Sequence, residues 1–154
     1  DNPFFNDLLK NSFLVKKFLV KTNKGKIKIE LMPDIAPITV GSFTKLVKEK
    51  FFDNVIFHRV VPNFVIQTGD PSGTGWRGPG YDIISETSTL PYKAGMIGMA
   101  SAGKDTEGSQ WFIMHSYYPH LNGIYSLFGK VIYGMDTVNN IDQDDKIISI
   151  TPIR

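Results

Sequence analysis

A guanidinium, a carboxamide and a phenyl ring lie close together in the segment FHRVVPNFVIQTGD. Arg59, Phe64 and Gln67 would be an unusual set for a plain pair of buried strands, because polar groups alternate there with large apolar ones. At the two-residue period of a strand, Arg59 and Val61 share one face, and Val65 and Gln67 share a face of the next strand. Arginine offers five fixed donors that stay charged at any working pH. We therefore treat this segment as a candidate binding or catalytic site.

A second unusual run is GMASAGKDTEGSQWFIM, from Gly98 to Met114. Its small residues allow the backbone of a ligand to approach closely, and Gln110 and Phe112 point the same way along a strand. Nine of the 14 glycines fall between positions 69 and 108. This glycine cluster needs an explanation that composition alone does not supply.

Several familiar functional motifs are either absent or not supported by the residues around them. Residues 73–78 spell GxGxxG, but Pro79 and Gly80 follow at once, whereas a phosphate cradle must lead into a helix. The three histidines have no HExxH spacing, and no serine stands in a GxSxG turn, so neither a metal centre nor a serine nucleophile is expected. These histidines are His58, His115 and His120.

The elements that must position these residues are short strands with few helices. A hairpin is expected around Asn23-Lys24-Gly25, because apolar and lysine residues alternate on both sides of it. Helices are expected at 3–13, 36–50 and 135–141. Further strands are expected at 55–61, 64–68, 96–100, 110–114, 127–133 and 146–153. Strands this short need closure to hide their edges, which favours a β-barrel or sandwich.

Composition limits the class of protein. The chain has 154 residues, 42% of them hydrophobic and 21% charged, as expected of a soluble single domain. No apolar run approaches the roughly 20 residues that span a membrane. The absence of cysteine excludes disulfides and thiolate metal sites. The chain begins at Asp1 without methionine, so we expect a trimmed or mature fragment, and its compartment, cytoplasmic or extracytoplasmic, stays open.

The segment FHRVVPNFVIQTGD, followed in order by GTG, MASAG, GSQWFI and LFGKV, resembles the cyclophilin family of peptidyl-prolyl cis-trans isomerases. The short stretch TGDPSGTGWRGPGY is more similar to prokaryotic members. The resemblance covers residues 14–154, the expected isomerase domain, and leaves residues 1–13 as an N-terminal extension. It implies a mainly β fold, a closed eight-stranded antiparallel barrel capped by two α-helices, here with a short helical extension.

The resemblance also implies the roles of the site residues. Arg59 matches the catalytic arginine, which hydrogen-bonds the substrate carbonyl and engages the prolyl nitrogen. Gln67 matches the glutamine that orients it. Gln110 matches the residue that grips the preceding part of the peptide, together with the backbone of Ala100 and Ser101. The proline pocket corresponds to Phe64, Val65, Phe112 and Leu121. The adjacent subsite corresponds to Thr74, Met99, Ala102 and Ser109.

Four positions depart from the common family pattern. Val65 replaces a frequent methionine and Ser101 a frequent asparagine. His120 stands where well-studied eukaryotic members have a tryptophan that supports binding of the cyclic peptide cyclosporin. Tyr125 replaces a frequent pocket histidine and keeps an aromatic wall. We expect isomerase activity to survive and cyclosporin binding to be weakened.

The activity implies no cofactor and no metal, because rotation about a prolyl bond breaks no bond. The expected partners are proline-containing peptides and unfolded protein chains, with no membrane span and a monomeric chain. An alternative is a proline-peptide-binding scaffold or chaperone module without turnover. A nucleic-acid-binding barrel would depend on the lysines of the hairpin; we favour a solvated strand edge there and expect no nucleic-acid partner.

Overall fold

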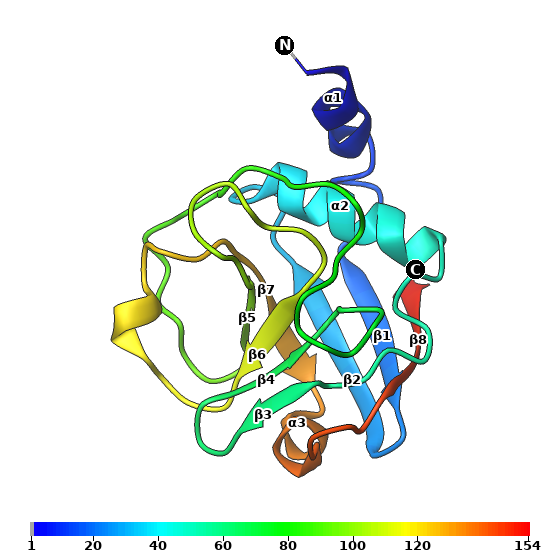
Figure 1. Ribbon diagram of the computed structural model, residues 1–154, viewed down its shortest axis with the longest axis vertical. Coiled ribbons are helices and arrows are strands. Elements are labelled where there is room, and N and C mark those ends of the chain that lie inside the picture. The colour runs from blue at the N-terminus through cyan, green and yellow to red at the C-terminus, as the bar shows by residue number, and fades with distance from the viewer. Residues whose placement is uncertain (1) are drawn as a thin grey trace.

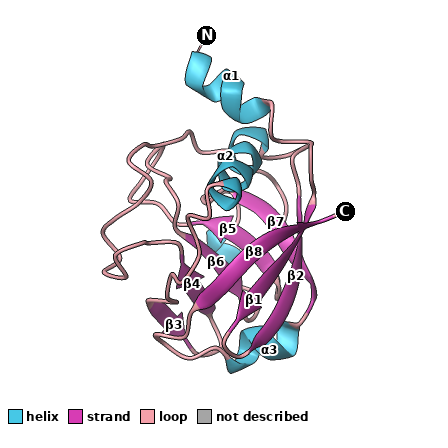
Figure 2. Ribbon diagram, turned by 90° about the vertical axis from the view of Figure 1, so that its right-hand side faces the viewer, coloured by secondary structure: helices cyan, strands magenta, loops and turns pink. Residues whose placement is uncertain are grey.

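The sheet is built from strands whose side chains alternate between buried and exposed positions. In the computed structural model, which describes residues 2–154, eight antiparallel strands follow the spatial order β3-β4-β6-β5-β7-β2-β1-β8. The strands are β1 (Lys17–Thr22), β2 (Gly25–Leu31), β3 (Arg59–Val61), β4 (Val65–Thr68), β5 (Met96–Met99), β6 (Trp111–Met114), β7 (Leu127–Tyr133) and β8 (Ile147–Ile153). The sheet curls into a half-barrel (Figures 1 and 2).

The predicted hairpin is confirmed by the register of β1 and β2. Phe18 lies opposite Ile29 and Val20 opposite Ile27, and all four side chains are buried. Residues directly opposite in an antiparallel pair point to the same face. The alternating pattern therefore places one apolar row inside the half-barrel and leaves the intervening lysines outside.

A closed barrel is not confirmed. Among the described strands, β3 and β8 are the two edges of the sheet and do not pair with each other. The segments that lead into them do meet: the amide of Phe57 donates to the Asp145 carbonyl at 2.7 Å, and the amide of Ile147 donates to the Val55 carbonyl at 2.9 Å. The expected strand at 55–61 is accordingly shorter, because its first half pairs with the chain before β8 through an isolated bridge.

Two helices cover opposite ends of the half-barrel, α2 (Pro37–Lys48) at one and α3 (Met135–Asn140) at the other (Figures 1 and 2). Helix α1 (Pro3–Leu9) lies outside α2, and a 3₁₀ turn, η1 (Pro119–Leu121), precedes β7. Pro37 occupies the first turn of α2, as expected. The Glu86 carboxylate accepts the amides of Ile38 and Thr39, satisfying donors at a helix start that lacks its own side-chain cap. No helix within residues 2–154 is long and apolar enough for a membrane crossing.

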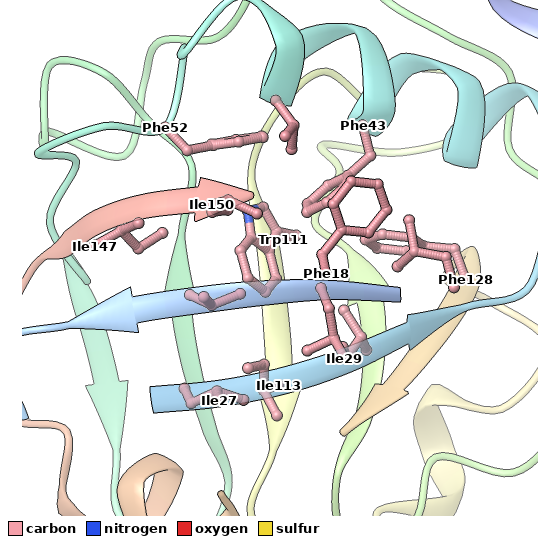
Figure 3. Packing of buried hydrophobic residues seen from close by; sticks show 14 of the residues in the cluster. Phe18, Ile27, Ile29, Phe43, Phe52, Trp111, Ile113, Phe128, Ile147 and Ile150 are labelled. Carbon is pink, nitrogen blue, oxygen red and sulfur yellow. The ribbon is translucent and has the colours of Figure 1, made fainter. Parts of the chain in front are cut away.

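Aromatic rings fill the space between the sheet and α2 (Figure 3). Phe43 of α2 contacts Phe18, Phe52, Trp111 and Phe128, with ring centroids 5.2–5.7 Å apart. All five rings are buried, so burial is the main source of their stabilisation, at roughly 25 cal/mol per Å² of apolar area removed from water. This core makes β4 and β6 a rigid base for the side chains on their outer face.

Candidate active site

The sheet register brings the predicted residues together on the outer face of β3, β4 and β6. Arg59 lies opposite Gln67, and Gln67 lies opposite Phe112. Val61 pairs with Val65, so the expected face-sharing of β3 and β4 is confirmed. The intervening residues face the core, as the buried Ile66 and Ile113 do, so the outer face is free to carry a site.

A chain of side-chain hydrogen bonds runs across this face. Arg59 Nη1 donates to Gln67 Oε1 at 3.3 Å, and Gln67 Nε2 donates to Gln110 Oε1 at 3.1 Å. Gln110 Nε2 in turn donates to the carbonyls of Gly75 (2.9 Å) and Arg77 (3.1 Å). The amide of Gln67 is thereby oriented with its oxygen toward the guanidinium. Arg59 keeps other donors exposed, and its guanidinium carbon lies 5.7 Å from the centroid of the Phe64 ring.

A cavity of about 340 Å³ opens beside Arg59. Its lining combines apolar and aromatic side chains with the guanidinium and one carboxamide. The lining residues are Arg59, Phe64, Val65, Gln67, Ala100, Ser101, Phe112, Leu121 and Tyr125. Each of them was expected in the site from the sequence. An apolar seat with fixed donors at its rim is suited to holding a small hydrophobic ring while polar contacts act on the atoms next to it.

Gly98 allows the floor of this first cavity to form. It lies opposite Phe112 in the β5–β6 pair. A Cβ at this position would lie 2.6 Å from Phe112 Cζ and would overlap the Tyr92 hydroxyl. Tyr92 is fully buried behind Phe112, with its hydroxyl donating to the Tyr125 carbonyl at 3.0 Å. Because Gly98 has no side chain, the rings of Tyr92 and Phe112 can pack against β5 at this position.

A second cavity, of about 560 Å³, adjoins the first. Gln67, Ala100 and Ser101 line both cavities. The second one extends between the glycine-rich turn and the loop before β6, and its lining includes Trp76, Tyr81, Ala102, Ser109 and Gln110. Trp76 is 91% exposed and stands at its rim. The two cavities form a continuous cleft along the outer face of β4 and β6.

The glycine-rich turn is organised by Asp70, whose carboxylate is buried. Burial alone would raise the pKa of Asp70, but hydrogen bonds from Ser72 and from the amides of Arg77 and Gly75 outweigh it and hold the pKa well below its usual range. The turn is therefore a compact structure around one buried charge. This arrangement presents the Gly75 and Arg77 carbonyls to Gln110.

Some predicted residues lie outside the two cavity linings. Met99 is 3% exposed and belongs to the core under the sheet. The Thr74 hydroxyl donates to the Asp70 carboxylate at 3.3 Å. His120 is exposed and contacts Tyr118 edge-on, with 5.6 Å between ring centroids. Ser109 lines the second cavity, but its hydroxyl is directed to the Gly69 carbonyl at 2.6 Å.

Residues that sequence reasoning missed support the site from behind. Tyr118 packs on Phe64 at a centroid distance of 4.4 Å, and Tyr92 packs on Phe112 at 5.6 Å. Burial lowers the pKa of His58, so the imidazole next to Arg59 in the chain is neutral at pH 7. Tyr92 and Tyr118 lie in irregular segments, where no periodic pattern indicates which side chains are buried. The family motifs on either side of them are the only sequence signal that the site lies nearby.

Within residues 2–154 no group of three or more His, Asp or Glu side chains is placed to hold a metal ion. The arrangement can bind an extended chain and donate hydrogen bonds from Arg59.

Comparisons with known proteins agree with this geometry. A family model described as cyclophilin type peptidyl-prolyl cis-trans isomerase/CLD matches residues 17–151. Peptidyl-prolyl cis-trans isomerase B of Bacillus subtilis is 52% identical over 123 residues, covering 79% of this chain and 86% of that protein. A peptidyl-prolyl cis-trans isomerase of Synechococcus elongatus is 41% identical over 134 residues, covering 86% and 92% respectively.

The fold matches as well. A crystal structure of a Cryptosporidium parvum cyclophilin type peptidyl-prolyl cis-trans isomerase, in the presence of the dipeptide Ala-Pro, has a TM-score of 0.85 and 34% identity. The match covers 90% of this chain and 99% of the other. The chain therefore belongs to the cyclophilin-type peptidyl-prolyl cis-trans isomerases, enzymes that rotate the peptide bond preceding proline.

Proposed function

We propose that the first cavity seats the proline ring of a substrate and that Arg59 is the catalytic residue. The bond before proline isomerises over a barrier of about 18–20 kcal/mol, because rotation removes the amide resonance. A catalyst has to bind the twisted amide more tightly than either planar form. The observation that carries the proposal is the guanidinium of Arg59, fixed by Gln67 at the rim of an apolar cavity.

The roles follow from the positions of the groups. Phe64, Val65, Phe112 and Leu121 hold the ring, so that the part of the peptide before proline rotates against a fixed partner. Arg59 donates to the substrate carbonyl and to the prolyl nitrogen as that nitrogen becomes pyramidal. Because guanidinium donors are fixed in a plane and always charged, they meet the developing lone pair without reorganising.

The residue next to the proline lies where the two cavities join, and the second cavity takes the residues before that one. Gln110 and the backbone of Ala100 and Ser101 lie where the two cavities join, which is where the chain of an extended peptide would run as an added strand. The Cryptosporidium relative was crystallised in the presence of Ala-Pro, which supports a proline dipeptide as the minimal ligand. The physiological substrates are proline-containing segments of unfolded chains.

Substitution of Arg59 tests the proposal. We expect Arg59→Ala to lower kcat/KM for cis-to-trans conversion of an Ala-Pro-Phe peptide roughly 100-fold, the usual loss for one preorganised donor. Arg59→Lys, which keeps the charge but loses the planar fork, should recover little of the activity. Arg154→Ala, at the exposed end of the chain, is the matched control.

Peptide binding measured on the same variants separates catalysis from simple binding. If the wild-type protein binds the peptide but leaves its isomerisation at the uncatalysed rate, the chain is a binding module and the proposal is wrong. If Arg59→Ala isomerises the peptide as fast as the wild type, the catalytic role of Arg59 is wrong while the activity stands.

A further inference from the structure

Helix α1 lies in the N-terminal segment, before the residues that the family model matches, and it contacts the wall of the cleft. The ring of Phe4 meets the ring of Tyr81 edge-on, with 4.8 Å between centroids. Tyr81 lines the second cavity. A residue outside residues 14–154, our proposed isomerase domain, therefore packs directly against a side chain of the proposed peptide site.

The N-terminal segment is docked on α2 by specific contacts. Leu8 is 1% exposed and packs in a cluster with Ile38 and Ile83. The Ser12 hydroxyl donates to the Pro37 carbonyl at 2.6 Å. The close approach depends on Gly41 of α2, where a Cβ would overlap the Leu8 carbonyl. Apolar burial and a polar contact together hold this segment against the body of the protein. Helix α1 accordingly lies next to α2 (Figures 1 and 2).

Tyr81 is held from its other sides by the body of the protein. Its hydroxyl is 2.7 Å from the Ser42 hydroxyl of α2, and the Lys45 ammonium lies 5.5 Å from its ring centroid. Two residues later, the Ile83 amide donates to the Glu107 carbonyl at 2.8 Å, joining this wall to the loop before β6. Phe4 adds an edge-on ring contact to these interactions.

We propose that residues 3–12 are a positioning element of the peptide cleft, which fixes Tyr81 and thereby the second cavity. The inference rests on the proposed function, because it requires that cavity to hold the peptide residues that lie before the one next to proline. Substrate chains long enough to enter the second cavity should depend on α1. Short substrates confined to the first cavity should not.

Two variants disturb the contact between this element and Tyr81 in different ways. Phe4→Ala removes the ring that contacts Tyr81, and Phe13→Ala is its matched control, because Phe13 directly follows this element and is 57% exposed. Gly41→Ala introduces the Cβ that displaces Leu8, while alanine favours the helical conformation of α2 itself. If Gly41→Ala fails to fold, Phe4→Ala still decides the matter.

The readout is KM and kcat for two peptides: Ala-Pro-Phe, and the same sequence extended by three residues before alanine. An aromatic pair of this kind corresponds to a change of about threefold to tenfold in affinity. We expect Phe4→Ala and Gly41→Ala to raise KM of the extended peptide by about that factor, with kcat unchanged. For these two variants, KM of the short peptide should stay within about twofold of the wild-type value. For Phe13→Ala, KM of both peptides should stay within the same range.

The possible results separate the two proposals. Equal losses on both peptides would show a general structural role and overturn the inference, as would unchanged KM values for the extended peptide. Equal KM values for the two peptides in the wild type would also overturn it, because the second cavity would then contribute nothing. Absence of isomerisation of either peptide by the wild type would instead refute the proposed function itself.

Discussion

Replacing Gly98 by alanine should damage the site through one added methyl group. The new Cβ would lie within 3 Å of both Phe112 and Tyr92. Tyr92 is fully buried and its hydroxyl is bonded to the Tyr125 carbonyl, so moving it would break a buried hydrogen bond. Phe112 has open space in front of it, the first cavity, and is the ring that should yield.

The magnitude follows from the crowding. Inserting a methyl group into a well-packed region costs about 1–3 kcal/mol. For a domain of this size each kcal/mol lowers Tm by about 2–4 °C, so we expect a decrease of roughly 2–12 °C. Phe112 displaced into the first cavity would also reduce the room for proline, so KM for Ala-Pro-Phe should rise. Thermal unfolding and steady-state kinetics measure the two effects.

Gly78→Ala is the stability control, since the nearest atom to its added Cβ, the Ser109 hydroxyl oxygen, lies at 3.7 Å, an ordinary contact distance. Its Tm should stay close to that of the wild type. A Gly98→Ala protein with unchanged Tm and unchanged KM would refute the reasoning, because it would mean that the two rings are not packed as tightly as described. A lowered Tm with unchanged KM would show that Tyr92, and not Phe112, moves.

Two further predictions concern acid stability and drug binding. The pKa of Asp70 is lower in the folded protein than its ordinary value of 3.8, so its carboxylate stabilises the fold at neutral pH, and this contribution is lost as pH falls through the acid range. Urea unfolding between pH 7 and pH 3 should therefore show a smaller pH dependence for Asp70→Asn than for the wild type; parallel curves would contradict this. Cyclosporin should inhibit weakly, because the exposed His120 stands where the resemblance implies a tryptophan that supports binding of the drug. Inhibition at nanomolar concentration would contradict this, and His120→Trp should strengthen the inhibition.

Much of the fold was predictable from local pattern. The hairpin of β1 and β2 follows from alternation, and α2 follows from Pro37 and the apolar period after it. The expected strand at 127–133 matches β7 in full. These elements were accessible because each buries one regular face, and that face is visible as a period in the sequence.

Other features depend on contacts between distant segments. The Glu86 carboxylate that accepts the first amides of α2 lies 48 positions beyond Ile38, and nothing near it in the sequence indicates that role. Met99 was expected at the subsite but points into the core. Successive residues of β5 face opposite sides of the sheet, and its neighbour Gly98 is the residue on the cleft side. The site residues themselves were found through ordered motifs, and it is the register of β3, β4 and β6 that explains why the motifs meet.

The shared lining of the two cavities has a consequence for inhibitor design. Because Gln67, Ala100 and Ser101 border both, two weak fragments, one in each cavity, can be joined by a short linker. Binding of the second fragment then becomes intramolecular, with an effective concentration in the millimolar range for a short flexible linker. The arm in the second cavity would meet Trp76 and Tyr81, side chains that do not line the first cavity, so its contacts can be varied without changing the arm in the first cavity.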